Sequence, residues 1–476
     1  MPFHRVVVLG GGPIGLLCAI EAKRYFPTVT IIEKRGGYSR NNVPSLNEPL
    51  IMHLDRIGVS KTLWPSGNSG SESIAFSRIE EALWQRARSL GITMERGYVV
   101  TSIIGNHMQK NGRYKRINLT LSAWDPATKA LAIGGASKQL ITDLLVVASG
   151  GGASRDNVVV QTLGFTFTKL RAKNYAAYGV FSIPEKGSVE LDYSAQSKFA
   201  RLTNQIVSGK IAFSTKDHNY LLVTLSQCTK TDFEFLQQNA DAFHVLLLAV
   251  SEGYQTSILQ EIKEVEKNTG LFKVSIQRAR HFCSSSYPAV IVGDAAVTPH
   301  PESGSGMVTG FAGVEQLSLL FKALQGTNRS SDNSASWLSF EQCYELFVSK
   351  KALEGTRVML RNLIKLIERF RDDAVAISRQ FNNLSVLGWV DEMVNTSDTL
   401  REVLKLQDFR AERLLGILNG EPEKFDWKQS GVDQLWADIS GAYKAIKQLT
   451  SDVGLFRKRV DELESGLVDR GRIAAV

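Results

Sequence analysis

The stretch VVVLGGGPIG near the N-terminus constrains the fold of this chain most strongly. The apolar run at 6–10 predicts a buried strand, and the helix that follows it is predicted from PIGLLCAIEAKRYF. A second buried strand is predicted from VTIIE, directly after that helix. Strands that alternate with helices in this way form parallel sheets. The sequence therefore predicts an α/β fold that begins with a Rossmann-like β–α–β unit.

The turn between this strand and helix has the GxGxxG spacing. Glycine at the first position permits a tight turn, at the second it lets the backbone approach a pyrophosphate, and at the third it lets the helix lie close to the sheet. The helix N-terminus adds amide groups and a partial positive charge. Glu33 ends the second strand, where a carboxylate accepts bonds from ribose hydroxyls and repels a 2′-phosphate. These features predict a site for the ADP-ribose part of FAD or NAD, formed by Gly10, Gly12, Pro13, Ile14, Gly15 and Glu33.

The segment IVGDAAVTPHPESGSGM at 291–307 distinguishes between the two dinucleotides. A buried strand leads to Asp294, and a proline-containing turn with Gly304 and Gly306 precedes the next helix. The carboxylate can bind a polyol chain, and glycines beside a helix N-terminus can stabilise a negatively charged isoalloxazine edge. FAD has a ribityl chain and an isoalloxazine, whereas NAD has neither. The sequence therefore predicts non-covalently bound FAD.

GxGxxG together with the distant GD…P…GxG resembles the group A flavoprotein monooxygenases of the p-hydroxybenzoate hydroxylase fold, over roughly residues 1–330. Two stretches are also similar to MICAL flavin monooxygenase domains: EKRGGYSRNNV at 33–43, and the segment from Gly293 to Phe311. The resemblance implies an FAD-binding domain with an inserted sheet. It also implies reduction of the flavin by NADPH or NADH, and a flavin C4a-hydroperoxide formed with O2 in a site that excludes water.

The resemblance also implies roles for single residues. Arg35 and Arg40 are expected at the adenosine and pyrophosphate end of FAD, with Lys34 in the same motif, and Asn42 near the flavin. Arg78 matches an arginine that the family often places near the cofactor. The residues expected along the ribityl chain and the isoalloxazine are Asp294, Pro301, Gly304, Ser305, Gly306 and Met307.

The candidate catalytic residues are His300, Pro301 and Asn42. An imidazole titrates near neutral pH, so His300 is a candidate acid or base. The alternative is a histidine placed by the turn without a proton-transfer role, which suits enzymes whose flavin and oxygen perform the difficult steps.

Two positions depart from the family pattern. Ser149 stands where the family usually has an acid that supports FAD and NADPH handling, so the mode of NADPH binding does not follow from the resemblance. MICAL enzymes carry a Trp in the proline-containing turn, where this chain has Pro301 next to His300. A MICAL-type substrate therefore does not follow either.

The hydrophobic pattern and local composition of the chain predict three regions. Residues 1–165 and 271–330 have the α/β pattern of the FAD-binding domain. Residues 166–270 are rich in aromatic and β-branched side chains and predict an inserted antiparallel sheet that binds substrate. Residues 337–476 read as a C-terminal helical domain with breaks at NNLSVLGW and LNGEPEKF.

Four basic residues recur every four positions in the helical region: Arg357, Arg361, Lys365 and Arg369. On a helix they form one basic stripe, which is either a solvated face or a docking surface for an acidic protein partner. The residues expected on the buried side are Val358, Leu360, Leu363, Ile364, Leu366 and Ile367.

Composition excludes several classes of protein. No apolar run approaches the ~18 residues of a membrane helix, and no signal peptide precedes the first strand, so we expect no membrane span and a cytoplasmic location. The net charge of +8 comes without a zinc-finger, RRM or basic-zipper signature, so we expect no nucleic-acid partner. The four cysteines are widely spaced, which argues against a disulfide framework, and no His or acid cluster has metal spacing.

The predicted function is FAD-dependent monooxygenation of an apolar or aromatic small molecule, with O2 and NADPH or NADH. The substrate is expected between the flavin and the inserted sheet, with walls from 175–181 and 213–225. One alternative is a MICAL-like activity, namely oxidation of a protein methionine or NADPH oxidation that yields H2O2. The other is a flavin-binding interaction protein without turnover, for which Ser149 is the only sequence support.

Overall fold

The computed structural model describes most of the chain outside several loops and the C-terminal segment. The described residues are 3–38, 44, 46–64, 74–105, 116–128, 130–151, 158–169, 174–183, 209–214, 219–228, 263–274, 277–299, 306–326, 333–381, 387–419 and 434–446.

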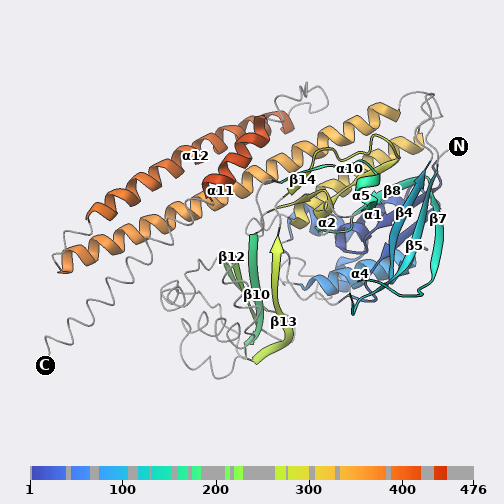
Figure 1. Ribbon diagram of the computed structural model, residues 1–476, viewed down its shortest axis with the longest axis horizontal. Coiled ribbons are helices and arrows are strands. Elements are labelled where there is room, and N and C mark those ends of the chain that lie inside the picture. Colours follow the sequence, from blue (N-terminus) through green and yellow to red (C-terminus); the bar gives the residue numbers. More distant parts are fainter. Residues whose placement is uncertain are drawn as a thin grey trace.

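A five-stranded parallel sheet, in the order β15–β8–β1–β2–β3, forms the centre of the N-terminal part (Figure 1). Its strands are β1 (Arg5–Leu9), β2 (Thr28–Glu33), β3 (Thr93–Arg96), β8 (Leu144–Val147) and β15 (Ala289–Ile291). Val6 of β1 lies opposite Val29 on one side and Leu144 on the other. Both faces of the central strands are covered, which is why their residues are almost all apolar. The predicted β–α–β start and parallel sheet are confirmed.

The helices of this part include α1 (Pro13–Lys23), α4 (Phe76–Ser89) and α10 (Gly306–Gly326), and the shorter α2 (Glu48–Arg56), α3 (Ser60–Leu63) and α5 (Val158–Thr162). α1 packs on β1, β2 and β8 of the sheet. α1 contacts both α4 and α10. α4 has apolar residues at the 3.6-residue spacing of an amphipathic helix, and it buries Ile79 and Leu83. A second, antiparallel sheet follows α4 and contains β4 (Tyr98–Gly105), β5 (Ile117–Asp125), β6 (Ala130–Leu131) and β7 (Ser137–Thr142).

The strand-rich region forms a four-stranded sheet in the order β11–β12–β10–β13, and every neighbouring pair is antiparallel. Its strands are β10 (Asn174–Ile183), β11 (Gly209–Ser214), β12 (Asn219–Cys228) and β13 (Lys263–Val274). The predicted antiparallel sheet is confirmed. A separate three-stranded sheet joins β9 (Phe167–Lys169), β14 (Gln277–Ala279) and β16 (Val297–Thr298). The domain boundaries stay predictions, although β13 continues past 270 and β9 pairs with β14 outside the four-stranded sheet.

Long helices form the C-terminal part: α11 (Asn333–Phe381), α12 (Leu387–Asn419) and a helix over 434–446. α11 has 49 residues and is therefore about 70 Å long at ~1.5 Å per residue. It packs against α10 near its N-terminal end and against α12 over its C-terminal part, and α12 runs antiparallel to it (Figure 1). The helices end at the two predicted breaks. Val358 was expected on the buried side of α11 but is 43% exposed, because it lies off the seam with α12 that buries Leu360 and Leu363.

The basic stripe is partly neutralised within this helical hairpin. Arg357 and Arg361 of α11 both pair with Asp408 of α12, the latter at 3.4 Å. Lys365 is exposed, and the side chain of Arg369 lies outside the described residues. Half of the stripe therefore helps to hold α12 in place.

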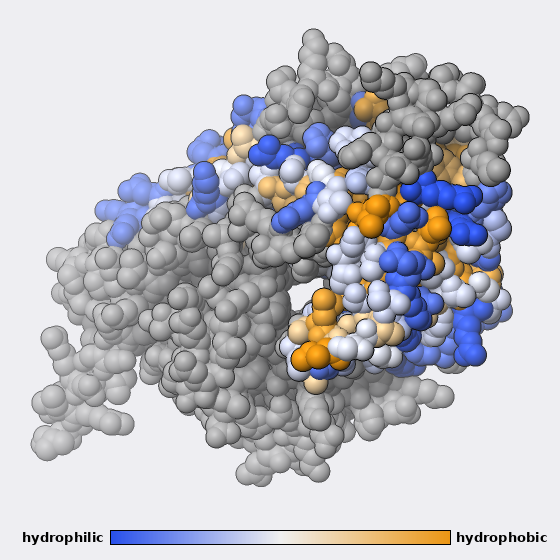
Figure 2. Space-filling model, turned by 45° about the vertical axis from the view of Figure 1, so that its right-hand side comes forward, coloured by the Kyte–Doolittle hydropathy of each residue, from blue (hydrophilic) through white to orange (hydrophobic). Residues whose placement is uncertain are grey.

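Hydrophilic side chains alternate with smaller apolar areas over the described part of the face in Figure 2. Within the ranges that the structure describes, no helix combines the length and the apolar character needed to cross a membrane.

A buried polar cluster joins α1, α2 and α10. Glu21 is 1% exposed; its carboxylate accepts from Ser318 and lies 3.4 Å from Nε2 of His53. Arg56 contacts the other ring nitrogen of His53, an arrangement that suits a neutral imidazole. Burial lowers the pKa of His53 to about 4, and Arg56 and Arg24 lower it as well, while Glu21 opposes the shift.

Acid should destabilise the protein through His53. The unfolded chain takes up this proton near pH 6.5, but the folded chain only near pH 4, so protonation favours unfolding throughout this window. Between these two pH values, the free energy of unfolding of the wild type should fall by roughly 1–3 kcal/mol more than that of His53→Gln. Denaturant titrations at several pH values measure the difference. Equal acid slopes for the two proteins would contradict the prediction.

Candidate cofactor site

Four segments that are distant in sequence meet at one edge of the parallel sheet. β1, β2, β8 and β15 are parallel neighbours, so their carboxyl ends lie together. Backbone bonds tie the loops that leave these ends: the amide of Gly10 donates to Ile32 at 2.8 Å, and that of Val292 donates to Val147 at 2.9 Å. The segments gathered here are 10–12, 33–35, 148–150 and 292–294.

The GxGxxG turn is packed as tightly as its sequence predicts. Gly10 has φ +105°, and a Cβ there would lie 2.4 Å from the carbonyl oxygen of Ala148. A Cβ at Gly15 would lie 1.9 Å from the carbonyl oxygen of Gly10. No side chain caps the N-terminus of α1, where the first amides of a helix lack intrahelical partners. The turn therefore offers a cradle of main-chain amides that fits the pyrophosphate of a dinucleotide.

Glu33 has four hydrogen bonds from within the protein. Oε1 accepts from the amide and Nε of Arg35, at 2.8 and 3.0 Å. Oε2 accepts from the amide of Gly11 at 2.7 Å and from Nη2 of Arg35 at 3.2 Å. Burial alone would raise the pKa of Glu33, but the hydrogen bonds and charge of Arg35, with the amides of Arg35 and Gly11, lower it below its ordinary value. The carboxylate is therefore ionised at neutral pH.

Arg35 also reaches a second buried carboxylate. Its Nη2 lies 3.3 Å from Oε1 of Glu80, a fully buried residue of α4. Arg35 therefore lies between Glu33 and Glu80 at the end of β2. Since four acceptor positions of the Glu33 carboxylate are in use, a ribose hydroxyl can bind it only by replacing one of these bonds.

The second half of the candidate site is the turn after β15. Gly293 has φ +63°, and the exposed Asp294 follows it. A Cβ at Gly306, the first residue of α10, would lie 3.4 Å from Oδ1 of Asp294. The N-terminus of α10 therefore faces Asp294. Met307, the next residue, is 7% exposed.

The remaining residues that the sequence placed at the cofactor lie away from the glycine turn, beside it, or outside the described part of the chain. Lys34 is exposed, and its amine lies 5.6 Å from the ring centroid of Trp124 in β5. Arg78 is exposed in the first turn of α4. Ser149 lies beside the glycine turn, since a Cβ at Gly10 would be 2.9 Å from its Cα. The predicted site residues that lie outside the described part of the chain are Arg40, Asn42, His300, Pro301, Gly304 and Ser305.

Sequence reasoning missed two residues that contact this site. Glu80 carried a local signal, because it is a charged residue within the apolar stripe of α4, three positions before Leu83. Tyr344 of α11 carried none. Its hydroxyl accepts from the amide of Gly293 at 3.1 Å, across 51 positions of sequence.

Gly15→Ala should disrupt the glycine turn. The new Cβ would overlap the carbonyl oxygen of Gly10, so the helix must move away from the sheet. We expect the free energy of unfolding of the apoprotein to fall by roughly 2–4 kcal/mol, as for overpacking and strain elsewhere. Gly36→Ala is the matched control, since its Cβ meets nothing within 4 Å, and it should change stability by less than about 0.5 kcal/mol. Equal stability of the two variants in denaturant titrations would contradict the packing described here.

Comparison with protein-family models finds no match. Two curated proteins share a short segment with this chain. F-actin monooxygenase Mical of Drosophila melanogaster is 33% identical over 93 residues, which are 20% of this chain and 2% of that protein. F-actin monooxygenase MICAL2 of Homo sapiens is 32% identical over 88 residues, which are 18% of this chain and 4% of that protein. The chain thus matches only a small part of the length of these relatives.

Solved structures resemble this chain over much more of its length. The p-nitrophenol 4-monooxygenase PnpA from Pseudomonas putida DLL-E4 is 14% identical with a TM-score of 0.51, and the match covers 96% of this chain and 98% of PnpA. The flavin-dependent monooxygenase PieE matches with a TM-score of 0.52 at 14% identity, over 94% of this chain and 72% of PieE. The flavin-dependent halogenase CmlS matches at 0.54 and 18% identity, over 75% of this chain and 65% of CmlS.

These likenesses confirm the predicted fold. The chain combines a parallel sheet, an inserted antiparallel sheet and C-terminal helices in the arrangement of flavin-dependent monooxygenases and halogenases. The resemblance to group A flavoproteins with weak MICAL similarity is confirmed at the level of the fold. The chain has the fold of the group A-like flavoprotein monooxygenases.

Proposed function

We propose that this protein is an FAD-dependent monooxygenase that uses NADPH or NADH and O2 to oxygenate a small organic molecule. The observation that carries the proposal is the meeting of the glycine turn, Glu33 and Asp294 at one edge of the parallel sheet. These are the three contacts that a single extended FAD molecule requires: pyrophosphate, adenosine ribose and ribityl chain.

Each part of the proposed site has a distinct task. Main-chain amides at the start of α1 bind the pyrophosphate, and the helix dipole stabilises its charge. Glu33, held ionised by Arg35, orients the adenosine ribose. Asp294 binds the ribityl hydroxyls opposite the N-terminus of α10. Bound FAD would supply hydride acceptance and O2 activation, chemistry that no side chain provides.

The substrate is proposed to bind between the flavin and the four-stranded sheet. β10 carries the predicted wall segment 175–181, and the described parts of the segment 213–225 lie at the end of β11 and in β12. An apolar wall excludes water, which favours oxygen transfer over the release of H2O2. Apolar and aromatic compounds are therefore the substrates to test first.

A MICAL-like activity is the second candidate, and the segment identities of 33% and 32% favour it. It would be NADPH oxidation with H2O2 release, or oxidation of a methionine in an acidic protein partner. The proposed docking surface, the basic stripe, has Arg357 and Arg361 paired with Asp408, which reduces the charge that it offers. Oxygenation of a small molecule is therefore the first proposal.

The function is tested first by anaerobic reduction. Holoprotein mixed with excess NADPH or NADH, with and without a panel of aromatic compounds, should lose the visible absorbance of oxidised flavin. Free FAD at the same concentration is the control. We expect at least one compound to accelerate bleaching by about tenfold or more, which corresponds to a decrease of ~1.4 kcal/mol or more in the activation free energy of flavin reduction. Absence of bleaching with both nucleotides and the full panel would contradict a nicotinamide-dependent monooxygenase.

Turnover in air then separates the two candidate activities. With isotopically labelled O2 and an accelerating compound, mass spectrometry should find one labelled oxygen atom in the product. A small-molecule monooxygenase should release little H2O2 under these conditions. Steady NADPH consumption with quantitative H2O2 and no labelled product would favour the MICAL-like activity instead. Consumption no faster than that of free FAD would favour a flavin-binding protein without turnover.

A further inference from the structure

Tyr344 of the C-terminal helix α11 touches the turn that carries Asp294. Its hydroxyl oxygen accepts the hydrogen bond from the amide of Gly293 at 3.1 Å, and the tyrosine is fully buried. Gly293 is in the left-handed region at φ +63° and directly precedes Asp294. The orientation of this peptide therefore decides where the chain leaves β15 and where the Asp294 carboxylate lies.

The ring of Tyr344 is closely packed by two aromatic side chains and by α10. It packs against Phe282 at 4.6 Å and Phe340 at 5.8 Å between ring centroids. A Cβ at Gly313 of α10 would lie 2.9 Å from its Cζ, so this glycine leaves the room that the ring occupies. Such packing holds the hydroxyl in a fixed place.

The Gly293 turn is also in close contact with Ile14 of α1 and with α10. A Cβ on Gly293 would lie 3.1 Å from Cγ2 of Ile14 in α1. A Cβ on Gly310 of α10 would lie 2.6 Å from Cγ1 of Ile14. The turn is thus held between α1, α10 and Tyr344. An amide buried in such a place needs its acceptor, because water cannot readily replace it.

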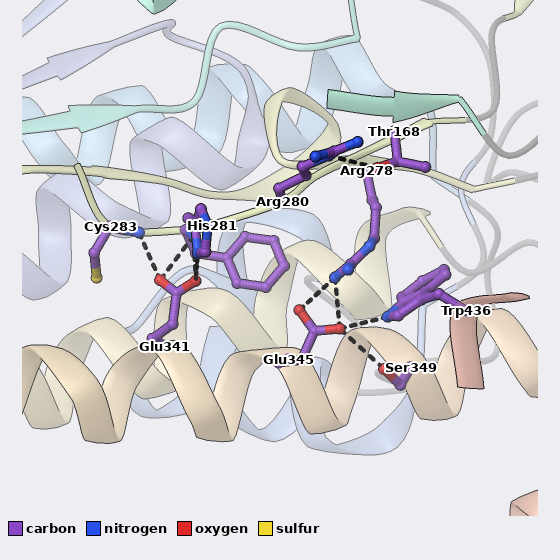
Figure 3. Close-up of polar contacts among 10 residues, drawn as sticks. Thr168, Arg278, Arg280, His281, Cys283, Glu341, Glu345, Ser349 and Trp436 are labelled. Carbon is purple, nitrogen blue, oxygen red and sulfur yellow. Dashed lines mark hydrogen bonds and ion pairs between the residues drawn. The ribbon is translucent and has the colours of Figure 1, made fainter. Parts of the chain in front are cut away.

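Two acidic residues fix the same face of α11 on the FAD-binding elements (Figure 3). Glu341 accepts from the amides of Phe282 and Cys283, at 2.8 and 2.7 Å for Oε2. Glu345 accepts two bonds of 2.6 Å from Arg278 of β14 and is bonded by Trp436. Tyr344 stands between these two anchors in sequence, so this part of α11 is held by two separate sets of contacts.

We propose that Tyr344 is a positioning residue of the cofactor site, and that its hydroxyl holds the Gly293 peptide in the orientation that FAD binding requires at Asp294. The first turns of α11 are then part of this site. The inference rests on the proposed function only in taking the ligand at Asp294 to be FAD.

Tyr344→Phe tests the proposal, because it removes the hydroxyl and keeps the ring. Without the hydroxyl, the buried Gly293 amide has no acceptor in its present orientation, so the peptide should turn toward another acceptor. Binding of FAD must then restore the original orientation and leave the amide without a partner. We therefore expect the FAD dissociation constant, measured by flavin fluorescence on adding FAD to apoprotein, to rise about 5- to 50-fold. Saturating FAD should bring the anaerobic reduction rate back to within about twofold of wild type, as for a loss confined to binding.

Two further variants distinguish positioning from general support. Tyr443→Phe removes the hydroxyl of another buried tyrosine, in the helix over 434–446, and should bind FAD as the wild type does. Glu345→Gln weakens one anchor of α11, while Glu341 and the packed ring of Tyr344 keep the bond to Gly293. It should therefore lower the unfolding temperature and leave FAD affinity within about twofold. An unchanged FAD affinity in Tyr344→Phe overturns the proposal. So does an equal loss of affinity in Glu345→Gln.

The assay reads FAD binding alone and is therefore separable from the proposed activity. Wild-type protein that binds FAD but is not reduced by NADPH or NADH would remove the monooxygenase and leave this inference standing. A Tyr344→Phe chain that does not fold would show that the hydroxyl serves folding itself, and would overturn the positioning role.

Discussion

The parallel register of β1 with its two neighbours is the constraint on which the candidate site depends. Val6–Leu9 pair with β2 on one side and with β8 on the other, and all four are buried. Because the side chains of neighbouring strand positions point to opposite faces, a slip of one residue would turn every packed side chain to the wrong face. The same register brings Gly10 to Ala148 and Gly11 to Glu33. The geometry of this edge is thus fixed by the packing of apolar strand residues that carry none of the chemistry of the candidate site.

Local patterns predicted much of this fold, because the elements involved have strong signals. The GxGxxG turn stands between an apolar strand and helix, and the apolar spacing of α4 repeats over four turns. The sheet of β4, β5 and β7 was not predicted. Its strand β7 is largely exposed and alternates weakly, so its place comes from pairing with β5 rather than from its own sequence. Sequence periodicity detects burial, and an exposed strand lacks that signal.

The candidate site was predictable where the chemistry is carried by neighbours in sequence. Glu33 and the glycines share one β–α–β unit, so their meeting follows from the motif. The bond from Arg35 to Glu80, and the contact of Tyr344 with Gly293, depend on how helices from distant segments pack. No spacing rule encodes such contacts, since each joins a buried polar group to a partner chosen by tertiary structure.

The C-terminal helices are joined to the N-terminal α/β part by polar contacts as well as by apolar packing. Arg278 and Glu345 are both nearly buried, and the guanidinium also lies 4.4 Å from the ring centroid of Trp436. The attraction within a buried ion pair offsets the cost of desolvation only when the geometry is good and further hydrogen bonds are made. Ser349 and Trp436 donate such hydrogen bonds to Glu345. Shifting α11 by one turn would leave two charges buried without partners. The pair therefore favours one arrangement of helix and sheet, the one that places Tyr344 against Gly293.

Charge at the end of β2 bears on which nucleotide can bind at this edge. Glu33 and Glu80 are two buried carboxylates that share the guanidinium of Arg35, so the group as a whole keeps one negative charge when both are ionised. A ribose with free hydroxyls can exchange bonds with this group without adding charge. A 2′-phosphate would add nearly two negative charges beside it, where the low local dielectric strengthens repulsion. It follows that the edge suits an adenosine whose ribose has free hydroxyls, as in FAD, and disfavours one with a 2′-phosphate, as in NADPH.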